Sequence, residues 1–271
     1  MMGKTYLTST SAVVPLIPKH LDCVPDVLSD LGAQSIPNDE IIFVASGFNS
    51  TDLSRLSQEL EKCKALKVLL LVVPLGPAGK NRNLGADAAQ GDLVMFLDVD
   101  DRYFPWRNER VLRAFNEGNL DALVHLAEHS SDPGSIFSNR VEKGPDLHDR
   151  VNLAEADQLA RDTFPDGNRD RNAELAGAAQ TNLILTGPNS NRPIHHAHAT
   201  VRRSILSTQK YHEQFFPRNE DGLFLRDLLF EGHRVAVLLE NLSIFSTGTS
   251  AVHWKAKLSW LAKSLGLFGR R

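Results

Sequence analysis

The chain has 271 residues, of which 42% are hydrophobic and 23% charged, the composition of an ordinary globular protein with a sizeable core. Thirty Lys and Arg residues against 33 Asp and Glu residues give a formal net charge of −3, which excludes a general polyanion binder, so we expect no nucleic-acid partner. The two cysteines, Cys23 and Cys63, exclude a disulfide-dense scaffold and a four-cysteine zinc site.

Hydropathy along the chain gives no sign of a membrane-spanning or secreted protein. No apolar run approaches the roughly 20 residues that span a bilayer. Residues 1–10 are polar and lack the apolar stretch of a secretory signal. We therefore expect a soluble, cytoplasmic protein whose contact with a membrane, if any, is peripheral.

The first half of the chain alternates short apolar runs with segments of helical periodicity. The predicted strands are 11–17, 40–44, 67–73 and 92–97, and the predicted helices are 20–34, 52–64 and 79–90. The run 67–73 is apolar almost throughout, so we expect a fully buried strand there. Strands separated by helices of this length indicate βαβ crossovers and a mostly parallel sheet.

The pattern changes after Leu126. Residues 128–180 are polar, with weak apolar periodicity and frequent Pro and Gly, and a stretch this long is usually functional rather than a plain connector. Regular elements resume with a predicted strand at 181–186, a helix at 221–231 and strands at 234–239 and 242–245. No segment has the composition of a linker, so we expect one domain with an elaborated second half.

A cluster of carboxylates, Asp98-Val99-Asp100-Asp101, follows the predicted strand 92–97. Ligands of open α/β sheets bind outside the carboxyl ends of the strands. Carboxylates this close repel one another unless they face water or share a cation, and a hard ion such as Mg²⁺ or Mn²⁺ bridging to a diphosphate suits them. On this motif alone, an acidic turn without a ligand is the alternative.

Haloacid-dehalogenase-like phosphatases also place an Asp-x-Asp motif after a strand and use the first Asp as a nucleophile. Their motif normally continues with Gly and Thr near the N-terminus. Here Asp101 and Arg102 follow instead, and four predicted strands come first. The phosphatase is therefore the less favoured alternative.

Two further segments, one before and one after the acidic cluster, have recognisable sequences. Residues 76–85 read Gly-Pro-Ala-Gly-Lys-Asn-Arg-Asn-Leu-Gly, and residues 215–222 read Phe-Phe-Pro-Arg-Asn-Glu-Asp-Gly at the start of a predicted helix. This order resembles the family 2 glycosyltransferases, in which a Gly-x-x-x-Ala-Arg-Asn segment precedes an apolar strand and Asp-x-Asp, and Glu-Asp opens a later helix. The resemblance covers about residues 11–250.

The resemblance implies a GT-A fold, a Rossmann-like and mostly parallel sheet flanked by helices, with an elaborated acceptor-side second half. Residues 1–271 would form a single glycosyltransferase domain, with a nucleotide-sugar-binding half (1–127), an acceptor-side half (128–252) and a basic amphipathic C-terminal tail (253–271). The implied function is metal-dependent, inverting transfer of one sugar from a nucleotide-diphospho-sugar to a hydroxyl of a glycan, a lipid or another acceptor. The Gln-x-x-Arg-Trp signature of processive synthases is absent after Asp221, which favours transfer of a single sugar.

Carried over residue by residue, the resemblance assigns roles to the acidic motifs. Asp98 would lie near the ribose and the metal, and Asp100 would be the main protein ligand of Mn²⁺ or Mg²⁺. Asp101 would lie close to the donor sugar or to the water shell of the metal. Asp221 would be the general base, and Glu220 would orient it or bind the acceptor. Helix N-terminal chemistry is the plain alternative for Glu220 and Asp221, since acids favour that end of the helix dipole.

The resemblance also assigns the nucleotide-binding floor. Pro15 and Ile17, at the end of the first predicted strand, would lie where the base and ribose rest. Arg82 and Asn83 would support this floor and the acidic loop.

The second predicted strand departs from the family pattern. It usually ends in two aspartates, one of which reads the nucleobase, whereas here Ala45, Ser46 and Gly47 follow. Ser46 is the remaining candidate for a hydrogen bond to the base, and the donor nucleotide stays open. The missing carboxylates motivate a second hypothesis, a non-catalytic module that binds a nucleotide-sugar or a glycan.

Histidines and the C-terminal tail complete the candidates. His195, His196 and His198 form a cluster for which we favour a structural or acceptor-facing role over a zinc site. His253 is a candidate metal ligand, because a loop histidine near the C-terminus completes the metal site in several glycosyltransferases of this fold. Residues 254–271 form a basic amphipathic pattern that either docks on the domain or touches an anionic membrane.

Overall fold

The computed structural model describes residues 8–63, 66–144, 183–186, 194–214 and 220–247. The strands are β1 (Thr10–Leu16), β2 (Glu40–Ser46), β3 (Val68–Val73), β4 (Leu93–Phe96), β5 (Arg102–Tyr103), β6 (Ala122–Ser130), β7 (Leu183–Thr186), β8 (Ile194–Arg202) and β9 (Val235–Ser246). The α-helices are α1 (Val24–Gly32), α2 (Ser50–Glu61), α3 (Ala78–Ala88), α4 (Arg107–Gly118), α5 (Pro133–Lys143) and α8 (Glu220–Phe230). Short 3-10 helices cover Pro18–Cys23 and Ile205–Ser207.

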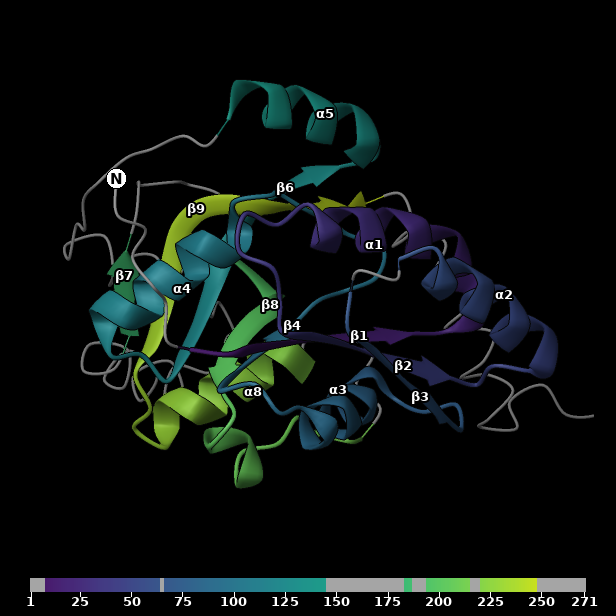
Figure 1. Ribbon diagram of the computed structural model, residues 1–271. Coiled ribbons are helices and arrows are strands. Elements are labelled where there is room, and N and C mark those ends of the chain that lie inside the picture. Colours follow the sequence, from purple (N-terminus) through teal and green to yellow (C-terminus); the bar gives the residue numbers. More distant parts are fainter. Residues whose placement is uncertain (1–7, 64–65, 145–182, 187–193, 215–219, 248–271) are drawn as a thin grey trace, which may run out of the picture.

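All nine described strands join one sheet in the order β3-β2-β1-β4-β8-β6-β9-β5, with β7 beside β9 (Figure 1). The strands β1 to β4 pair in parallel, and so do β6 with β9 and β7 with β9. The antiparallel pairs involve β8 and β5. The prediction of a mostly parallel sheet is therefore confirmed, and β8 links the two halves of the chain within it.

The order in which the chain adds strands to the sheet reverses between β1 and β4, although these two strands are parallel. From β1 the chain moves outward to β2 and β3, and it then returns through α3 to β4 on the other side of β1. Open α/β sheets bind ligands in the crevice that such a reversal leaves at the carboxyl ends of the strands. The topology thus places the candidate site beyond the ends of β1 and β4.

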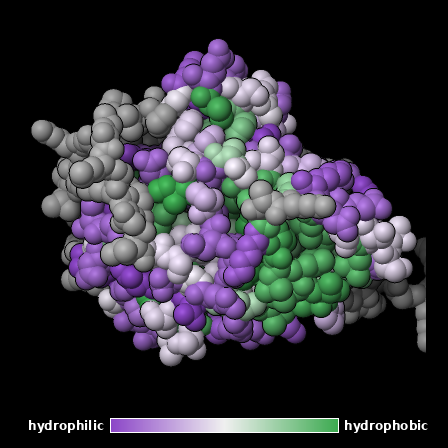
Figure 2. Space-filling view, in the orientation of Figure 1, coloured by the Kyte–Doolittle hydropathy of each residue, from purple (hydrophilic) through white to green (hydrophobic). Residues whose placement is uncertain are grey.

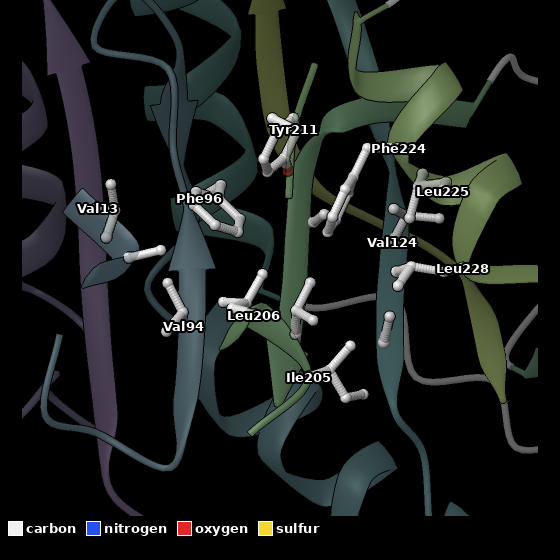
Figure 3. Packing of buried hydrophobic residues seen from close by; sticks show 14 of the residues in the cluster. Val13, Val94, Phe96, Val124, Ile205, Leu206, Tyr211, Phe224, Leu225 and Leu228 are labelled. Carbon is white, nitrogen blue, oxygen red and sulfur yellow. The ribbon is translucent and has the colours of Figure 1, made fainter. Parts of the chain in front are cut away.

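Helices cover both faces of the sheet (Figure 1). One core cluster joins α1 and α2 to β1 and β2, and another lies between the sheet and the helices α3 and α8. In the second cluster Tyr211 bridges the layers, because its ring contacts Phe96 of β4 edge-on at 5.0 Å and stacks on Phe224 of α8 at 4.0 Å (Figure 3).

The boundaries of two predicted elements differ from those in the structure. The predicted helix 20–34 is a 3-10 helix followed by α1, and the break falls beside Pro25, whose missing N–H cannot continue a helix. The predicted strands 234–239 and 242–245 are one strand, β9, whose register against β6 shifts around Leu126. A β-bulge keeps a strand continuous while interrupting the alternation that a sequence pattern needs.

The prediction of a fully buried strand at 67–73 was wrong. β3 is the edge strand of the sheet, with Leu69 41% and Val72 52% exposed, and Leu75 just after it is 64% exposed. Figure 2 shows a hydrophobic area on this side of the molecule. An apolar run fits a central strand and an edge strand equally well, so composition alone could not separate them.

Two helices lie where apolar periodicity singled out none. Helix α4 buries Val111, Leu112 and Phe115 on one face. Helix α5 buries none of its residues and lies within the polar stretch that begins at 128.

Within the described part of the chain, no helix combines the length and the apolar character needed to cross a membrane.

The helix α3 packs against the sheet through Gly85. A Cβ atom at this position would lie 2.3 Å from Val13 Cγ1 of β1 and 3.1 Å from Val44 Cγ2 of β2. We expect Gly85→Ala to lower the free energy of unfolding by about 1–3 kcal/mol, because both neighbours lie in buried strands that give little. Urea unfolding followed by circular dichroism measures the change.

Gly32 provides the matched control, since it ends α1 and a Cβ there has no heavy atom within 4 Å. We expect Gly32→Ala to be neutral or to stabilise by up to about 1 kcal/mol. Equal effects of the two substitutions would contradict the close packing of α3.

Candidate active site

The acidic loop crosses the carboxyl end of β4. Tyr103 Oη donates a hydrogen bond to the backbone carbonyl of Asp98 at 2.7 Å, and the N–H of Asp101 turns back to the same carbonyl at 3.3 Å. The Asp98 side chain is 26% exposed, and Asp100 is partly exposed. The backbone of the loop is therefore fixed by Tyr103, while Asp98 and Asp100 stay partly exposed at the carboxyl end of β4.

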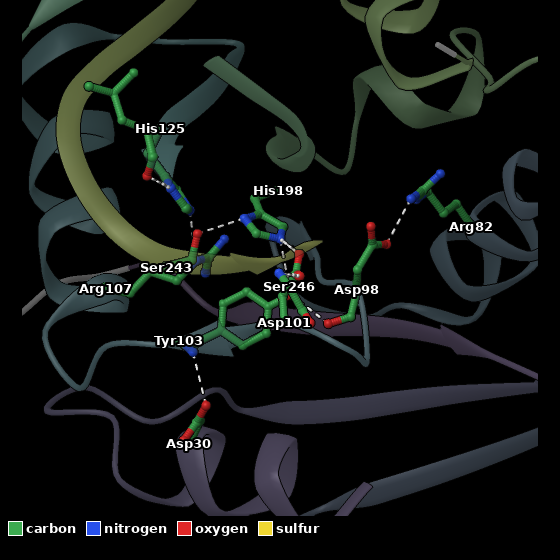
Figure 4. Close-up of polar contacts among 11 residues, drawn as sticks. Asp30, Arg82, Asp98, Asp101, Tyr103, Arg107, His125, His198, Ser243 and Ser246 are labelled. Carbon is green, nitrogen blue, oxygen red and sulfur yellow. Dashed lines mark hydrogen bonds and ion pairs between the residues drawn. The ribbon is translucent and has the colours of Figure 1, made fainter. Parts of the chain in front are cut away.

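A buried arginine joins the acidic loop to the second acidic motif. Arg82 of α3 donates from Nη2 to Asp98 at 2.8 Å and from Nη1 to Glu220 at 3.1 Å (the contact with Asp98 is drawn in Figure 4). Its side chain is only 4% exposed, and the guanidinium lies 5.4 Å from the centroid of the Tyr211 ring. Burial opposes the charge, but the carboxylates of Asp98, Asp221 and Glu220 outweigh it and raise the pKa of Arg82.

At Asp98, burial outweighs the attraction of the opposite charge. The pKa of its carboxyl group is raised to about 6, because burial, Asp100 and Asp221 together raise it by more than the attraction of Arg82 lowers it. The ionised form is thus held by a single arginine among several like charges. A further cation at this point would relieve the repulsion.

The second acidic motif opens α8. Glu220 and Asp221 are its first residues, where the helix dipole favours negative charge. Asp221 Oδ1 accepts a hydrogen bond from the N–H of Gly222 at 2.9 Å. Glu220 is engaged by Arg82, so Asp221 is the one of the pair whose carboxylate has no arginine contact among the described residues.

The other residues predicted for the nucleotide-binding floor lie close to this crevice. Pro15 and Ile17 lie at the carboxyl end of β1 and are partly exposed. Asn83 is buried and holds residues 211–213 instead of facing solvent: its amide donates to Tyr211 O at 2.9 Å and to Glu213 at 3.2 Å, and its oxygen accepts from Tyr211 N. Asn83 therefore braces the segment that precedes α8.

Ser46 is fully buried at the end of β2. Its hydroxyl donates to Pro74 O at 3.1 Å and accepts from the N–H of Gly76 at 3.0 Å. The structure thus gives Ser46 the task of tying β2 to the loop before α3. A hydrogen bond to a nucleobase stays a prediction, and it would require this tie to open.

Asp101 is also buried, at 1% exposure. Its Oδ1 accepts from the N–H of Ser246 at 2.9 Å, and its Oδ2 pairs with Nε2 of His198 at 2.8 Å (Figure 4). Burial raises the pKa of its carboxyl group well above the ordinary value, and Asp98 and Asp100 add to the shift. The contact of Asp101 with a donor sugar stays a prediction, whereas its anchoring contacts are part of the fold.

The carboxylate oxygens of the loop are suitable ligands for a hard divalent cation. Within the described ranges no group of three or more His, Cys, Asp or Glu side chains is arranged to hold a metal. Mg²⁺, however, is usually held by one or two carboxylates together with water and substrate phosphates, and Asp98 and Asp100 supply that number. The predicted third ligand, His253, lies outside the described residues.

The remaining predictions have a mixed outcome. The backbone of His195 and His196 belongs to β8, but their side chains are not among those described. The side chain of His198 is fully buried, which agrees with the structural role favoured for the cluster. The tail 254–271 lies outside the described residues, so its contact with the domain or with a membrane stays a prediction.

Sequence comparison assigns the chain to a family. The family model described as glycosyl transferase family 2 matches residues 11–185, well over half of the chain, so the chain belongs to this family. Two curated relatives, both uncharacterized glycosyltransferases of Haemophilus influenzae, are 29% and 32% identical over 120 and 91 residues. These segments cover 44% and 34% of the chain but only 38% and 36% of the relatives.

Solved structures show the same fold at low identity. The mannosyltransferase PcManGT from Pyrobaculum calidifontis, in complex with GDP-Man and Mn²⁺, has a TM-score of 0.59 at 12% identity and covers 89% of this chain and 58% of its own. TarS 1–349 of S. aureus, in complex with UDP-GlcNAc, has a TM-score of 0.53 at 18% identity, with 88% and 58% covered.

A third structure is glucosyl-3-phosphoglycerate synthase from Mycobacterium tuberculosis, in complex with Mg²⁺ and UDP, with a TM-score of 0.52 at 14% identity and 90% and 76% covered. At these identities the likeness shows the fold alone. The predicted GT-A fold is thereby confirmed.

The effect of removing Arg82 on stability should depend on pH. We expect Arg82→Met to lower the free energy of unfolding by about 3–5 kcal/mol at pH 7, because two largely buried carboxylates lose their cation. The pKa of Asp98 is already about 6 in the folded protein against an ordinary 3.8, so its ionised form opposes folding above pH 4. Losing Arg82 raises that pKa further, so the contribution of Asp98 to the difference from wild type shrinks as the pH falls below 7 and is small below about pH 5, where Asp98 is protonated in both folded proteins.

Urea unfolding at a series of pH values measures this difference. The exposed pair of Arg113 and Glu117 provides the control, since Arg113→Met should change stability by less than about 1 kcal/mol at every pH. An Arg82→Met deficit that stays constant with pH would contradict the electrostatic role of the bridge.

Proposed function

We propose, from the premise that the chain belongs to glycosyl transferase family 2, that it moves one sugar from a nucleotide-diphospho-sugar to an acceptor hydroxyl with inversion at the anomeric carbon and with the help of a divalent cation. The observation that carries this proposal is the bridge of Arg82 between Asp98 and Glu220. It brings the two acidic motifs, far apart in the sequence, together at the carboxyl end of the sheet.

The donor half of the reaction belongs to the acidic loop. Pro15 and Ile17 lie beside it and offer a partly exposed apolar floor for the base and ribose. Proteins of the same fold support a nucleotide donor with a divalent ion, because GDP-Man with Mn²⁺ and UDP with Mg²⁺ occur in two of the structures named above.

Asp98 and Asp100 are the residues that would hold the cation. Bound there, the cation supplies positive charge that stabilises the diphosphate as it leaves. Arg82 contributes fixed positive charge on the protein side of Asp98. It also keeps Asp98 ionised, because its attraction lowers the pKa that burial raises.

The acceptor half belongs to α8. In an inverting transfer the acceptor oxygen forms a bond to the anomeric carbon while the bond to the diphosphate breaks on the opposite face. The hydroxyl proton must pass to a carboxylate, and Asp221 is the better candidate because Arg82 already engages Glu220. Glu220 then fixes the start of α8, and through it the place of Asp221, relative to the acidic loop.

The role of Asp221 can be tested with a nearly isosteric substitution. We expect Asp221→Asn to lower the rate of transfer about 100-fold or more, because the amide cannot accept the hydroxyl proton. The affinity for the donor should change less than threefold. The release of nucleoside diphosphate measures transfer, and calorimetry measures donor affinity.

Glu231→Gln is the control for this test, because it removes a carboxylate from the exposed end of the same helical segment. Full turnover by Asp221→Asn would reject the assignment of the base. A wild-type protein that binds the donor but transfers sugar to no acceptor would instead support a non-catalytic binding module.

Asp100 can be tested by binding alone. A thermal-shift screen of UDP- and GDP-sugars with Mn²⁺ should raise the melting temperature of the wild type by roughly 5–10 °C at 100 times the dissociation constant. Asp100→Asn should lose most of that shift, and so should the wild type in EDTA. Glu117→Gln, which changes an exposed carboxylate paired with Arg113 on α4, should keep it. A shift that is unaffected by EDTA would contradict the role of the cation.

A further inference from the structure

A chain of hydrogen bonds lies beneath the acidic loop. Ser243 Oγ lies 2.8 Å from Nδ1 of His198, and Nε2 of His198 lies 2.8 Å from Asp101 Oδ2 and 3.2 Å from Tyr103 Oη (Figure 4). The side chains come from β9, β8, the acidic loop and β5. None of the four is more than 1% exposed.

The geometry assigns a direction to each bond. Tyr103 has one hydroxyl proton, and it is given to the carbonyl of Asp98. Its oxygen can therefore only accept from Nε2 of His198, so Nε2 carries a hydrogen and also donates to Asp101. Nδ1 then accepts from the hydroxyl of Ser243. Together with the N–H of Ser246, this arrangement satisfies both oxygens of Asp101.

The burial of these residues decides what the chain of bonds can do. A serine, a histidine and an aspartate in contact also form the nucleophilic site of many hydrolases. Here Ser243 and His198 are fully buried, so no substrate carbonyl can reach the hydroxyl. The contacts can only hold the surrounding segments in place.

His198 connects to both ends of the acidic loop. Through Asp101 it holds the end of the loop, and through the oxygen of Tyr103 it holds the hydroxyl that anchors the carbonyl of Asp98. Asp100, which is partly exposed, lies between these anchors. The shifts of register between β6 and β9 lie just before Ser243, and bulges of this kind re-aim side chains near functional sites.

A second buried histidine and an arginine lie below the loop. Arg107 of α4 donates from Nε to Nε2 of His125 at 3.0 Å, and the ring of His125 lies 5.4 Å from that of His198. Nδ1 of His125 lies 3.0 Å from the carbonyl of Leu126, which is the partner its hydrogen needs. Arg107 is thus the cation in contact with His125, and both imidazoles can stay neutral.

We propose that His198 is a positioning residue for the donor, which holds the Asp98–Asp101 loop in the shape that presents Asp98 and Asp100 to the donor diphosphate. The inference rests on the proposed function, because it assumes that the loop binds the donor. It assigns His198 no contact with the substrate. Its action passes through Asp101 and Tyr103.

Two amide substitutions separate the two sides of the imidazole. The amide of Gln reaches about as far as Nε2, and that of Asn only about as far as Nδ1. His198→Gln should therefore keep the bond to Asp101, and His198→Asn should keep only the contact with Ser243. The probe is UDP or GDP with Mn²⁺, whichever the wild type binds more tightly, and calorimetry gives its dissociation constant.

We expect His198→Asn to weaken binding of the probe about tenfold or more and to raise the KM for the donor but not for the acceptor. His198→Gln should bind within about threefold of wild type. His198→Gln loses one buried hydrogen bond, to Ser243, and His198→Asn loses two, to Asp101 and Tyr103, so the melting temperature should fall further in His198→Asn. Equal binding by the two variants would overturn the proposal.

Two further variants separate an effect on donor binding from a general loss of stability. Val201→Ala, on the same strand, should lower the melting temperature without changing binding of the probe, since Val201 belongs to the apolar core. Tyr103→Phe removes one hydroxyl and should weaken binding several-fold, and unchanged binding would overturn the proposal even if His198→Asn does not fold. A wild-type protein that binds neither probe would reject the proposed function itself.

Discussion

The site depends on the pairing of buried charge. Asp98 and Glu220 are both largely removed from water, and a carboxylate in such a position is costly unless a cation pairs with it. Arg82 is that cation, and its planar guanidinium reaches both carboxylates at once, which a lysine ammonium on a single flexible stem would do less well. The rest of the site is built to keep this one side chain in place.

Close packing of α3 gives Arg82 its position. A Cβ at Gly79 would lie 2.3 Å from the carbonyl oxygen of His212, so the first turn of the helix lies directly against the segment before α8. Asn83, one residue after Arg82, exchanges hydrogen bonds with the backbone of Tyr211. Helix α3, residues 211–213 and α8 therefore behave as one unit, and the distance between the donor side and the base is fixed by backbone contacts more than by loops.

The sequence predicts the parts of this arrangement that have a local signature. The parallel strands, the acidic loop after β4 and the acids opening α8 could be recognised from periodicity and motif order. The partner of Asp101 could not, because His198 lies 97 residues away and only the pairing of β8 with β4 brings it near. The burial of Asp101 was equally hidden, since a run of acids in a sequence does not reveal which carboxylate turns inward.

The hydrophobic edge of the sheet has a practical consequence for work with the purified protein. Edge strands of stable proteins are usually protected by lysine, proline or a bulge, because unpaired backbone groups recruit further strands. The six residues of β3 contain none of these, and Lys67 stands just outside the strand. Val72, whose side chain is 52% exposed, is therefore the first position at which to introduce a charge if the chain associates at high concentration.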